Sequence, residues 1–139
     1  MKIKLIDYGA AETGYLPKRA DYSSVGADVR ASRAYTVPPG KTAVLGLGFG
    51  IQLPDGMAGY VFPRSSLAAK GVVCQLPPID PGYTGEIHAV VTNHGPEPFV
   101  IAPGQRIGQL VVMPYIGAEF IAGKLESRRG ARAFGSTGE

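Results

Sequence analysis

The chain has 139 residues, which fits one domain, and 45% of them are hydrophobic, which argues against a disordered protein. Gly (20 residues) and Pro (12 residues) make up nearly a quarter of the chain, about twice ordinary usage, so turns are in excess. The net charge of +3 is small, the single cysteine excludes an internal disulfide, and two histidines without paired spacing argue against a zinc site.

No apolar run approaches the ~18 residues of a membrane span, so we expect no membrane partner. The first residues contain no signal-peptide apolar region, because Asp7 ends the run too early. We therefore expect a cytoplasmic protein, or one of the host-cell interior if the source is viral.

The clearest periodic segment is 42–53, where every odd position is apolar. This alternation predicts one strand with one buried face. Glycines 46, 48 and 50 lie on the opposite face and indicate a bend or a close backbone approach. Segments 85–92 and 107–113 predict further strands, and 65–70 predicts one short helix. Many short strands between Gly/Pro turns indicate an all-β sandwich or closed barrel.

The chain divides into a β-rich core, 1–123, and a basic C-terminal arm, 124–139. The arm carries a net charge of +2 and the other 123 residues only +1, which suggests that the arm meets an anion. This is weak evidence for nucleic acid, which usually requires a larger basic face, and we expect no nucleic-acid partner. Residues 127–138 have no periodicity and should be flexible without ligand.

Three segments contain candidate site residues, and each has a plainer interpretation. Arg64, Ser65 and Ser66 follow an apolar run and suit an anion such as phosphate, or a serine simply caps the short helix. Asp80 could be a general base and Tyr83 a stacking platform, or Asp80 only forms a turn. In the arm, arginine and backbone N–H groups could hold phosphates while Phe134 stacks on a base, or the arm is a solubilising tail.

Other candidates carry weaker signals. Asp28 could hold a metal through water, or it is a plain loop acid. Gln109 enters an apolar strand and faces either a ligand or solvent. His88 and His94 are expected at exposed strand and turn positions, and Cys74 is expected to be a small core residue.

The order of these segments is more specific than any one of them. Gly-Ala-Asp, Pro-Arg-Ser-Ser, Ile-Asp-Pro-Gly-Tyr-x-Gly-Glu-Ile, Gly-Gln-Arg-Ile-Gly-Gln-Leu and Arg-Gly-x-x-x-Phe-Gly-Ser-Thr-Gly occur in turn between residues 24 and 138. The series resembles the five ordered motifs of the homotrimeric dUTP diphosphatase (dUTPase) family. The resemblance implies a jelly-roll homotrimer with active sites shared between subunits, which hydrolyses dUTP to dUMP and diphosphate with Mg²⁺.

By this resemblance, Asp80 activates water for attack on the α-phosphorus, and Tyr83 stacks under the deoxyribose and excludes a 2′-hydroxyl. Asp28 holds Mg²⁺ through water. The remaining matches are substrate-binding residues of the uracil hairpin, the phosphate site and the closing arm: Pro78, Ile79, His88, Arg64, Ser65, Ser66, Gln109, Arg129, Phe134, Gly135, Ser136 and Thr137. Such chemistry needs positioning, charge neutralisation and one group that orients water.

Two departures and two alternatives accompany the resemblance. Cys74 stands where many members carry a uracil-contacting Asn, and Pro77 where a Gly is usual.

The related dCTP deaminases, and bifunctional deaminases, require a Glu on the strand after Asp80, but Val90 occupies that place and cannot move protons. A non-catalytic nucleotide-sensing module on the same fold would have no reason to retain Asp80, Tyr83 and both motif arginines together.

Overall fold

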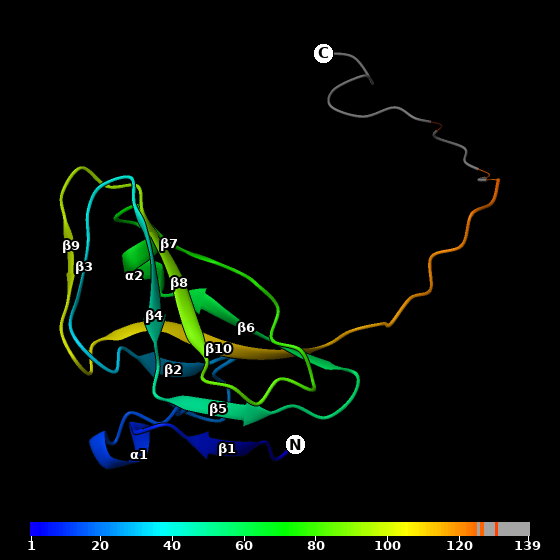
Figure 1. Ribbon diagram of the computed structural model, residues 1–139, viewed down its shortest axis with the longest axis horizontal. Helices are drawn as coiled ribbons and strands as arrows, with labels where there is room; N and C mark the ends of the chain where they lie inside the picture. Colours follow the sequence, from blue (N-terminus) through cyan, green and yellow to red (C-terminus); the bar gives the residue numbers. More distant parts are fainter. Residues whose placement is uncertain (125, 127–129, 131–139) are drawn as a thin grey trace.

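The computed structural model describes residues 1–124, 126 and 130, and Figure 1 shows the arrangement of its elements. In chain order the elements are β1 (Lys4–Asp7), α1 (Ala10–Thr13), β2 (Ala27–Arg30), β3 (Tyr35–Val37), β4 (Thr42–Gly46), β5 (Phe49–Gln52), β6 (Met57–Pro63), α2 (Ser65–Ala68), β7 (Val72–Gln75), β8 (His88–Asn93), β9 (Phe99–Ile101) and β10 (Arg106–Pro114).

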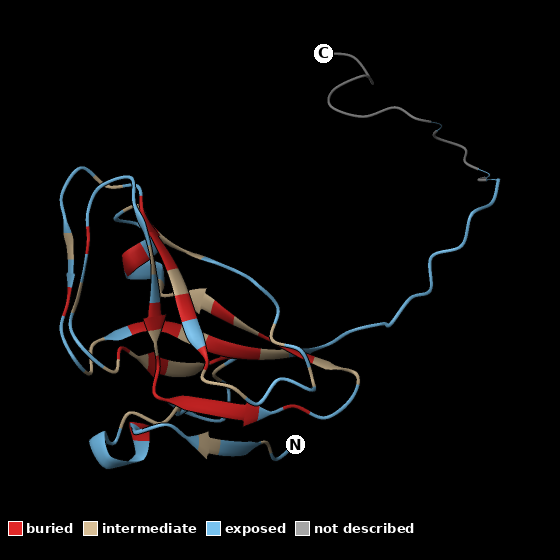
Figure 2. Cartoon of the chain, in the orientation of Figure 1, coloured by how far each residue is buried: buried red, intermediate tan, exposed pale blue. Residues whose placement is uncertain are grey.

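The protein is all-β, as the sequence predicts, and it has a jelly-roll fold. Every strand pair is antiparallel, in the orders β1-β5, β2-β10-β6, β3-β9 and β4-β8-β7. The sheets enclose one apolar core, and the buried residues are concentrated in β5, β6, β8 and β10 (Figure 2). Because β10 lies between β2 and β6, residues far apart in the sequence meet across this central strand.

The segment 42–53 is not one continuous strand. It breaks after Gly46 because Gly48 has φ +74°, a conformation that non-glycine residues rarely adopt. The chain changes partners at the break, since β4 pairs with β8 and β5 pairs with β1. The apolar alternation survives the break, and Leu45, Leu47, Phe49 and Ile51 are all buried.

The two helices are short. The predicted helix at 65–70 is present as α2 and ends two residues early, at Ala68. Helix α1 was not predicted from the sequence. At the start of this helix, the Asp7 carboxylate accepts hydrogen bonds from the backbone N–H groups of Gly9 and Ala11.

The packed body ends where β10 ends, at Pro114, and residues 115–124 leave it as an exposed segment without helix or strand (Figures 1 and 2). Ile116 and Phe120 are more than 90% exposed, and Ile121 is exposed too. Within the described part of the chain, no helix has the length and apolar character to cross a membrane.

Candidate active site

A pocket of about 270 Å³ opens beside the loop that joins β7 to β8. The loop is fastened to β6 through Ile79, which exchanges two backbone hydrogen bonds with Gly59, of 2.8 and 3.0 Å. The predicted residues that line the pocket are Pro78, Ile79, Asp80, Tyr83 and His88. Its volume is slightly below the about 300–1,000 Å³ of sites that bury a whole drug-sized ligand, so it suits one part of a larger molecule.

Asp80 begins a β-turn in this loop, but its carboxylate does not make the turn. The turn closes through the backbone, where Tyr83 N–H donates to the Asp80 carbonyl over 3.1 Å, and Pro81 occupies the position that this turn favours for proline. The Asp80 side chain is exposed, and among the described residues it makes no hydrogen bond or ion pair. A carboxylate without a protein partner, at the edge of a pocket, is available to a ligand or to water.

Tyr83 lies over the backbone that follows it. A Cβ atom built on Gly85 would come within 3.0 Å of three Tyr83 atoms, so glycine is needed there for the ring to pack. The Tyr83 hydroxyl donates to the Glu86 carbonyl over 2.9 Å. The side chain remains 45% exposed. The ring is therefore held at its hydroxyl end while part of it faces the pocket.

The sequence did not assign Glu86 to the site. Glu86 lines the same pocket as Asp80, and its carboxylate accepts a 2.8 Å hydrogen bond from Gly48 N–H. His88 Nε2 lies 3.8 Å from Glu86 Oε2. Gln75 and Val61 also line the pocket. The contact between Glu86 and Gly48 joins residues 38 positions apart, and no local sequence pattern reports it.

A second group of predicted residues gathers at one end of the sheet β2-β10-β6. Gln109 of β10 pairs with Asp28 of β2 on one side and with Phe62 of β6 on the other. Position 26 needs a glycine, because a Cβ atom built there would lie only 2.8 Å from the Gln109 Cβ. Asp28 does not stand free, since its Oδ2 accepts a hydrogen bond from Arg106 over 3.0 Å.

Arg64, Ser65 and Ser66 follow the end of β6, on the far side of β10 from Asp28. The capping interpretation of the serines is wrong. Arg64 is the residue at the helix start, α2 has no side-chain cap, and both serine side chains are exposed. The two hydroxyls are thus not engaged in holding the helix.

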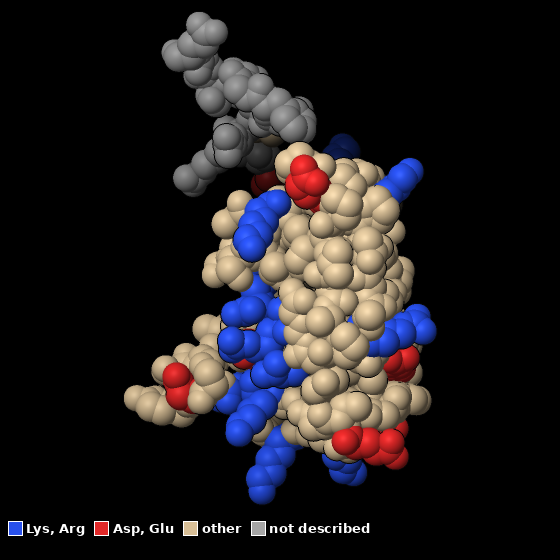
Figure 3. All heavy atoms as spheres, turned by 90° about the vertical axis from the view of Figure 1, so that its left-hand side faces the viewer, with Lys and Arg blue, Asp and Glu red and all other residues tan. Residues whose placement is uncertain are grey.

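Cations surround Asp28. A cleft of about 320 Å³ is lined by Lys18, Arg19, Arg30 and Arg106, and Asp28 is the one carboxylate among its described lining residues. Figure 3 shows Lys and Arg side chains gathered on one face of the body. This end of the sheet is consequently suited to a polyanion rather than to a neutral group.

Comparisons with known proteins identify the family of the chain. The family model described as dUTPase matches residues 12–138. A deoxyuridine 5′-triphosphate nucleotidohydrolase of Rhizobium etli is 39% identical over 98% of this chain and 93% of its own, and one of Tropheryma whipplei is 42% identical over 90% of each.

The chain belongs to the dUTPase family. The fold agrees as well: the dUTPase of Staphylococcus bacteriophage 80alpha, solved with dUPNHPP, superposes with a TM-score of 0.88 over 99% of both chains, at 21% identity.

One dUTPase chain does not bring its predicted site residues into one place. Gly59, which holds Ile79, lies five residues before Arg64, or roughly 16 Å along an extended chain. The bridge is antiparallel, so the step from Ile79 to Asp80 leads away from Arg64. None of Asp28, Arg64 and Gln109 lines the pocket that contains Asp80. Within a chain, the residues beside the loop and the residues at the end of the sheet therefore form two separate groups, which we call half-sites.

The donor set at the sheet end fits a family magnesium ion only through water. Mg²⁺ keeps several waters and is usually held by one or two carboxylates together with substrate phosphates. Asp28 supplies one carboxylate, and Arg106 already takes one of its oxygens. Among the described residues, no three His, Cys, Asp or Glu side chains cluster as a metal site. These residues would hold the ion weakly without the nucleotide.

Cys74 does not line the pocket. It pairs with Val91 in the sheet β4-β8-β7 and packs against the core, as expected from the sequence. Burial raises the pKa of its thiol to about 11, so the group is a neutral thiol at physiological pH. Pro77, the other departure from the family pattern, does line the pocket, and so does Val90 in place of the deaminase Glu.

The arm residues of the fifth motif lie outside the described residues: Arg129, Phe134, Gly135, Ser136 and Thr137. Their roles stay predictions.

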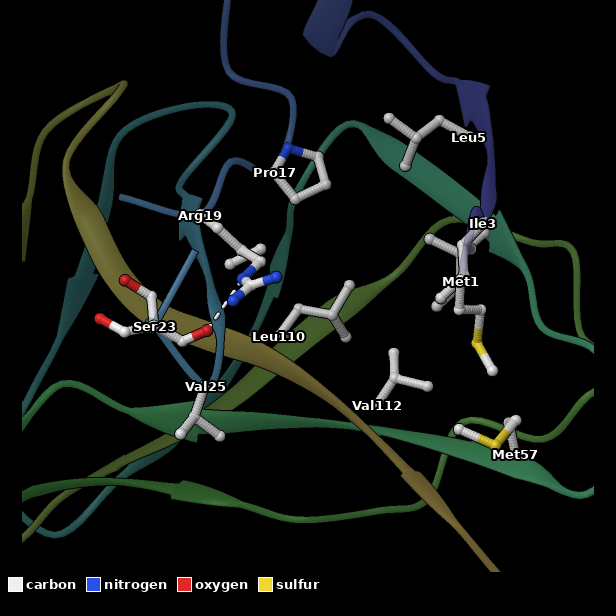
Figure 4. Close-up of a pocket in the computed structure, with 13 residues that line it drawn as sticks. Met1, Ile3, Leu5, Pro17, Arg19, Ser23, Val25, Met57, Leu110 and Val112 are labelled. Atoms are coloured by element: carbon white, nitrogen blue, oxygen red, sulfur yellow. Dashed lines mark hydrogen bonds between the residues drawn. The ribbon is translucent and has the colours of Figure 1, made fainter. Parts of the chain in front are cut away.

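A further hollow in the body, lined mostly by apolar side chains, lies elsewhere. It has a volume of about 710 Å³ and lies between the N-terminal segment and the sheet β2-β10-β6. Figure 4 shows Ile3 and Leu5 on one side and Leu110 and Val112 of β10 on the other, with Val25 at the rim. Val25 is 83% exposed. Exposed apolar surface is typical of surfaces that bind a partner.

Proposed function

We propose that the protein hydrolyses dUTP to dUMP and diphosphate, with Asp80 as the residue that activates water. The observation that carries the proposal is the Asp80 carboxylate, which has no partner among the described residues and lies at the edge of a pocket that also presents Tyr83. Membership in the dUTPase family and relatives named deoxyuridine 5′-triphosphate nucleotidohydrolase support the substrate.

In the proposed reaction, the Asp80 carboxylate orients a water molecule and accepts its proton as the oxygen attacks the α-phosphorus. A new P–O bond forms from water, and the bond between the α-phosphorus and the bridging oxygen to the β-phosphorus breaks. Diphosphate leaves with the electron pair of that bond. Ser65 would donate to the bridging oxygen, while Arg64 and Gln109 contact the phosphates and offset their charge. Ser66 would add a second hydroxyl donor.

The nucleoside would occupy the pocket beside the loop. Ile79, Pro78 and their backbone would contact uracil, Tyr83 would lie under the deoxyribose, and His88 would flank the base from β8. Asp28 would hold Mg²⁺ through water, and the ion, when bound, would neutralise triphosphate charge.

We infer that the active unit is a homotrimer with shared sites. Two observations support this inference. The two half-sites lie apart in one chain, which supports a site that a neighbouring chain completes. The body also presents a large apolar hollow and an exposed apolar segment at 115–121, which association would cover.

The decisive experiment offers dUTP, dCTP, dTTP and UTP with Mg²⁺ and measures both diphosphate and ammonia. Diphosphate from dUTP alone is the expected result. Ammonia from dCTP would replace the proposal with the deaminase alternative, which the apolar Val90 in the pocket argues against. Nucleotide binding without any product would indicate the non-catalytic sensing module.

The arm is proposed to close over the bound nucleotide, with Arg129 at the γ-phosphate and Phe134 over uracil. Deleting residues 127–139 should leave folding and assembly intact but lower kcat/KM for dUTP by about tenfold or more, because a stacking contact and a charged contact are lost together. Thermal unfolding and light scattering check the first expectation, and steady-state kinetics checks the second. Unchanged kinetics would remove the closing role.

A further inference from the structure

Glu86 joins the candidate site to the break between β4 and β5. Its carboxylate accepts a hydrogen bond from Gly48 N–H at 2.8 Å, and Gly48 is the residue with positive φ where the two strands part. The Glu86 side chain is 33% exposed. A hydrogen bond from an ionised carboxylate to a backbone N–H is among the stronger kinds, so this contact fixes residue 86 relative to the sheet.

Gly46 makes room for this carboxylate. A Cβ at position 46 would lie 2.7 Å from Glu86 Oε1, and its three nearest atoms all belong to the Glu86 side chain. Gly46 does not have a positive φ, so its backbone would accept another residue. The space that glycine leaves open at this position is the space that the Glu86 carboxylate occupies.

Residue 86 in turn holds Tyr83. The Tyr83 hydroxyl donates to the Glu86 carbonyl over 2.9 Å, and the ring packs on Gly85. The position of the ring therefore depends on where the backbone of residues 85 and 86 lies. Neighbouring contacts hold the same segment: the Tyr8 hydroxyl donates to the Thr84 carbonyl, and Ile87 N–H donates to the Phe49 carbonyl while the Ile87 carbonyl accepts from Leu47 N–H.

From these contacts we infer that Glu86 is a positioning residue that sets sugar specificity, by fixing the Tyr83 ring at the distance from the nucleoside that admits hydrogen but not hydroxyl at the 2′ carbon. The inference rests on the proposed function, in which Tyr83 lies under the deoxyribose. Without the hydrogen bond from Gly48 N–H, the segment of residues 84–86 can move away from the sheet by a few tenths of an ångström. The ring would then yield to a 2′-hydroxyl, and UTP would compete better with dUTP.

The test compares kcat/KM for dUTP with kcat/KM for UTP in four variants. Glu86→Ala removes the carboxylate, and Gly46→Ala displaces it while leaving its charge in place. Glu86→Gln retains an oxygen that can accept from Gly48 N–H. Glu12→Ala, in α1, is the matched control, since it removes an exposed carboxylate that does not line the pocket.

We expect Glu86→Ala and Gly46→Ala to lower the dUTP-to-UTP ratio by about tenfold, the equivalent of one charge-assisted hydrogen bond. Glu86→Gln and Glu12→Ala should stay within about twofold of the parent ratio, since the exposed Glu86–His88 pair contributes little. The ratio does not depend on the fraction of molecules that fold, because both substrates meet the same active population. A parent-like ratio in Glu86→Ala overturns the inference.

Binding of dUMP and UMP, measured by calorimetry in the same variants, separates this inference from the proposed function. If the parent protein binds dUMP in preference to UMP but releases no diphosphate, the proposed hydrolysis is wrong while the ratio of the two dissociation constants still tests Glu86. A preference equal in the parent and in Glu86→Ala contradicts the role of Glu86 whatever the turnover.

Discussion

Asp80 illustrates how one side chain can be assigned from what it does not contact. The turn that contains it closes through the backbone, and its carboxylate makes no hydrogen bond or ion pair to the described residues. A structural aspartate in a turn normally bonds the N–H groups that follow it, as Asp7 does at the start of α1. The contrast between the two residues supports a chemical role for Asp80.

Asp80→Asn should lower kcat for dUTP hydrolysis by about 10²–10⁴, the usual contribution of a general base, because an amide cannot accept the water proton. Binding of dUMP should change by less than about threefold, since the substitution keeps the shape of the side chain. Diphosphate release measures the first quantity and titration calorimetry the second. If dUMP no longer binds, Asp80 is structural and the base must be another group.

Cys74 provides a residue-scale prediction about pH. Burial raises the pKa of its thiol from an ordinary 9.0 to about 11. Between these values the unfolded chain releases the thiol proton and the native protein retains it, so the free energy of unfolding falls as pH rises through this window. The decrease should stay well under about 1.4 kcal/mol per pH unit, because the thiol is only partly buried.

Urea unfolding of the parent and of Cys74→Ala at about pH 8 and about pH 10 tests this expectation, since other groups that titrate there affect both proteins equally. The parent should lose more stability than the variant between the two conditions. Equal losses would mean that the thiol is solvated in the native state.

At the scale of elements, the glycines at alternate positions 46, 48 and 50 determine where the loop that contains Asp80 can lie. A Cβ at Gly50 would lie 2.7 Å from the Gly85 carbonyl oxygen and 3.0 Å from that of Thr84. The part of the loop that leads into β8 therefore packs directly on β5. The sequence predicted a close approach on this face from its glycines alone. It did not identify which segment approaches, because a glycine indicates that space is needed beside the backbone but not which residues fill that space.

Gly50→Ala should therefore destabilise the protein by about 1–3 kcal/mol, as overpacking does, because both clashing atoms belong to the backbone and cannot turn aside. Thermal unfolding measures the effect. Gly123→Ala is the control, since a Cβ there meets nothing within 4 Å. A midpoint for Gly50→Ala equal to that of the control would show that the loop moves away from β5 without cost.

The strands and the loop differ in how well the sequence predicts them. Alternation identified the buried face of 42–53 correctly, but it passed through the break at Gly48, since Leu47 and Phe49 remain in phase on either side. The turn chemistry of Pro81 and Gly82 located Asp80 and Tyr83. The contact of Glu86 with Gly48, and the pairing of Asp28 with Arg106, depend on strand pairing over long separations and could not be predicted locally.

For the whole molecule, the exposed segment 115–121 suggests where assembly is sensitive. If the segment packs in the proposed trimer, Ile116→Asp combined with Phe120→Asp should convert it into monomers, because two charges would enter an apolar contact where they cannot be hydrated. Light scattering after size exclusion measures the mass. Glu119→Gln in the same segment is the matched control. A trimer that persists in the double variant would place the interface elsewhere on the body.

Because Asp80 and Arg64 lie on half-sites that one chain does not unite, damage to the two residues has an unusual genetic consequence. In the proposed trimer, chains altered only at Asp80 would be inactive, and so would chains altered only at Arg64. A mixed trimer, however, would join the intact Asp80 of one chain to the intact Arg64 of another. Two null alleles in one cell would then complement each other, although neither encodes a working enzyme.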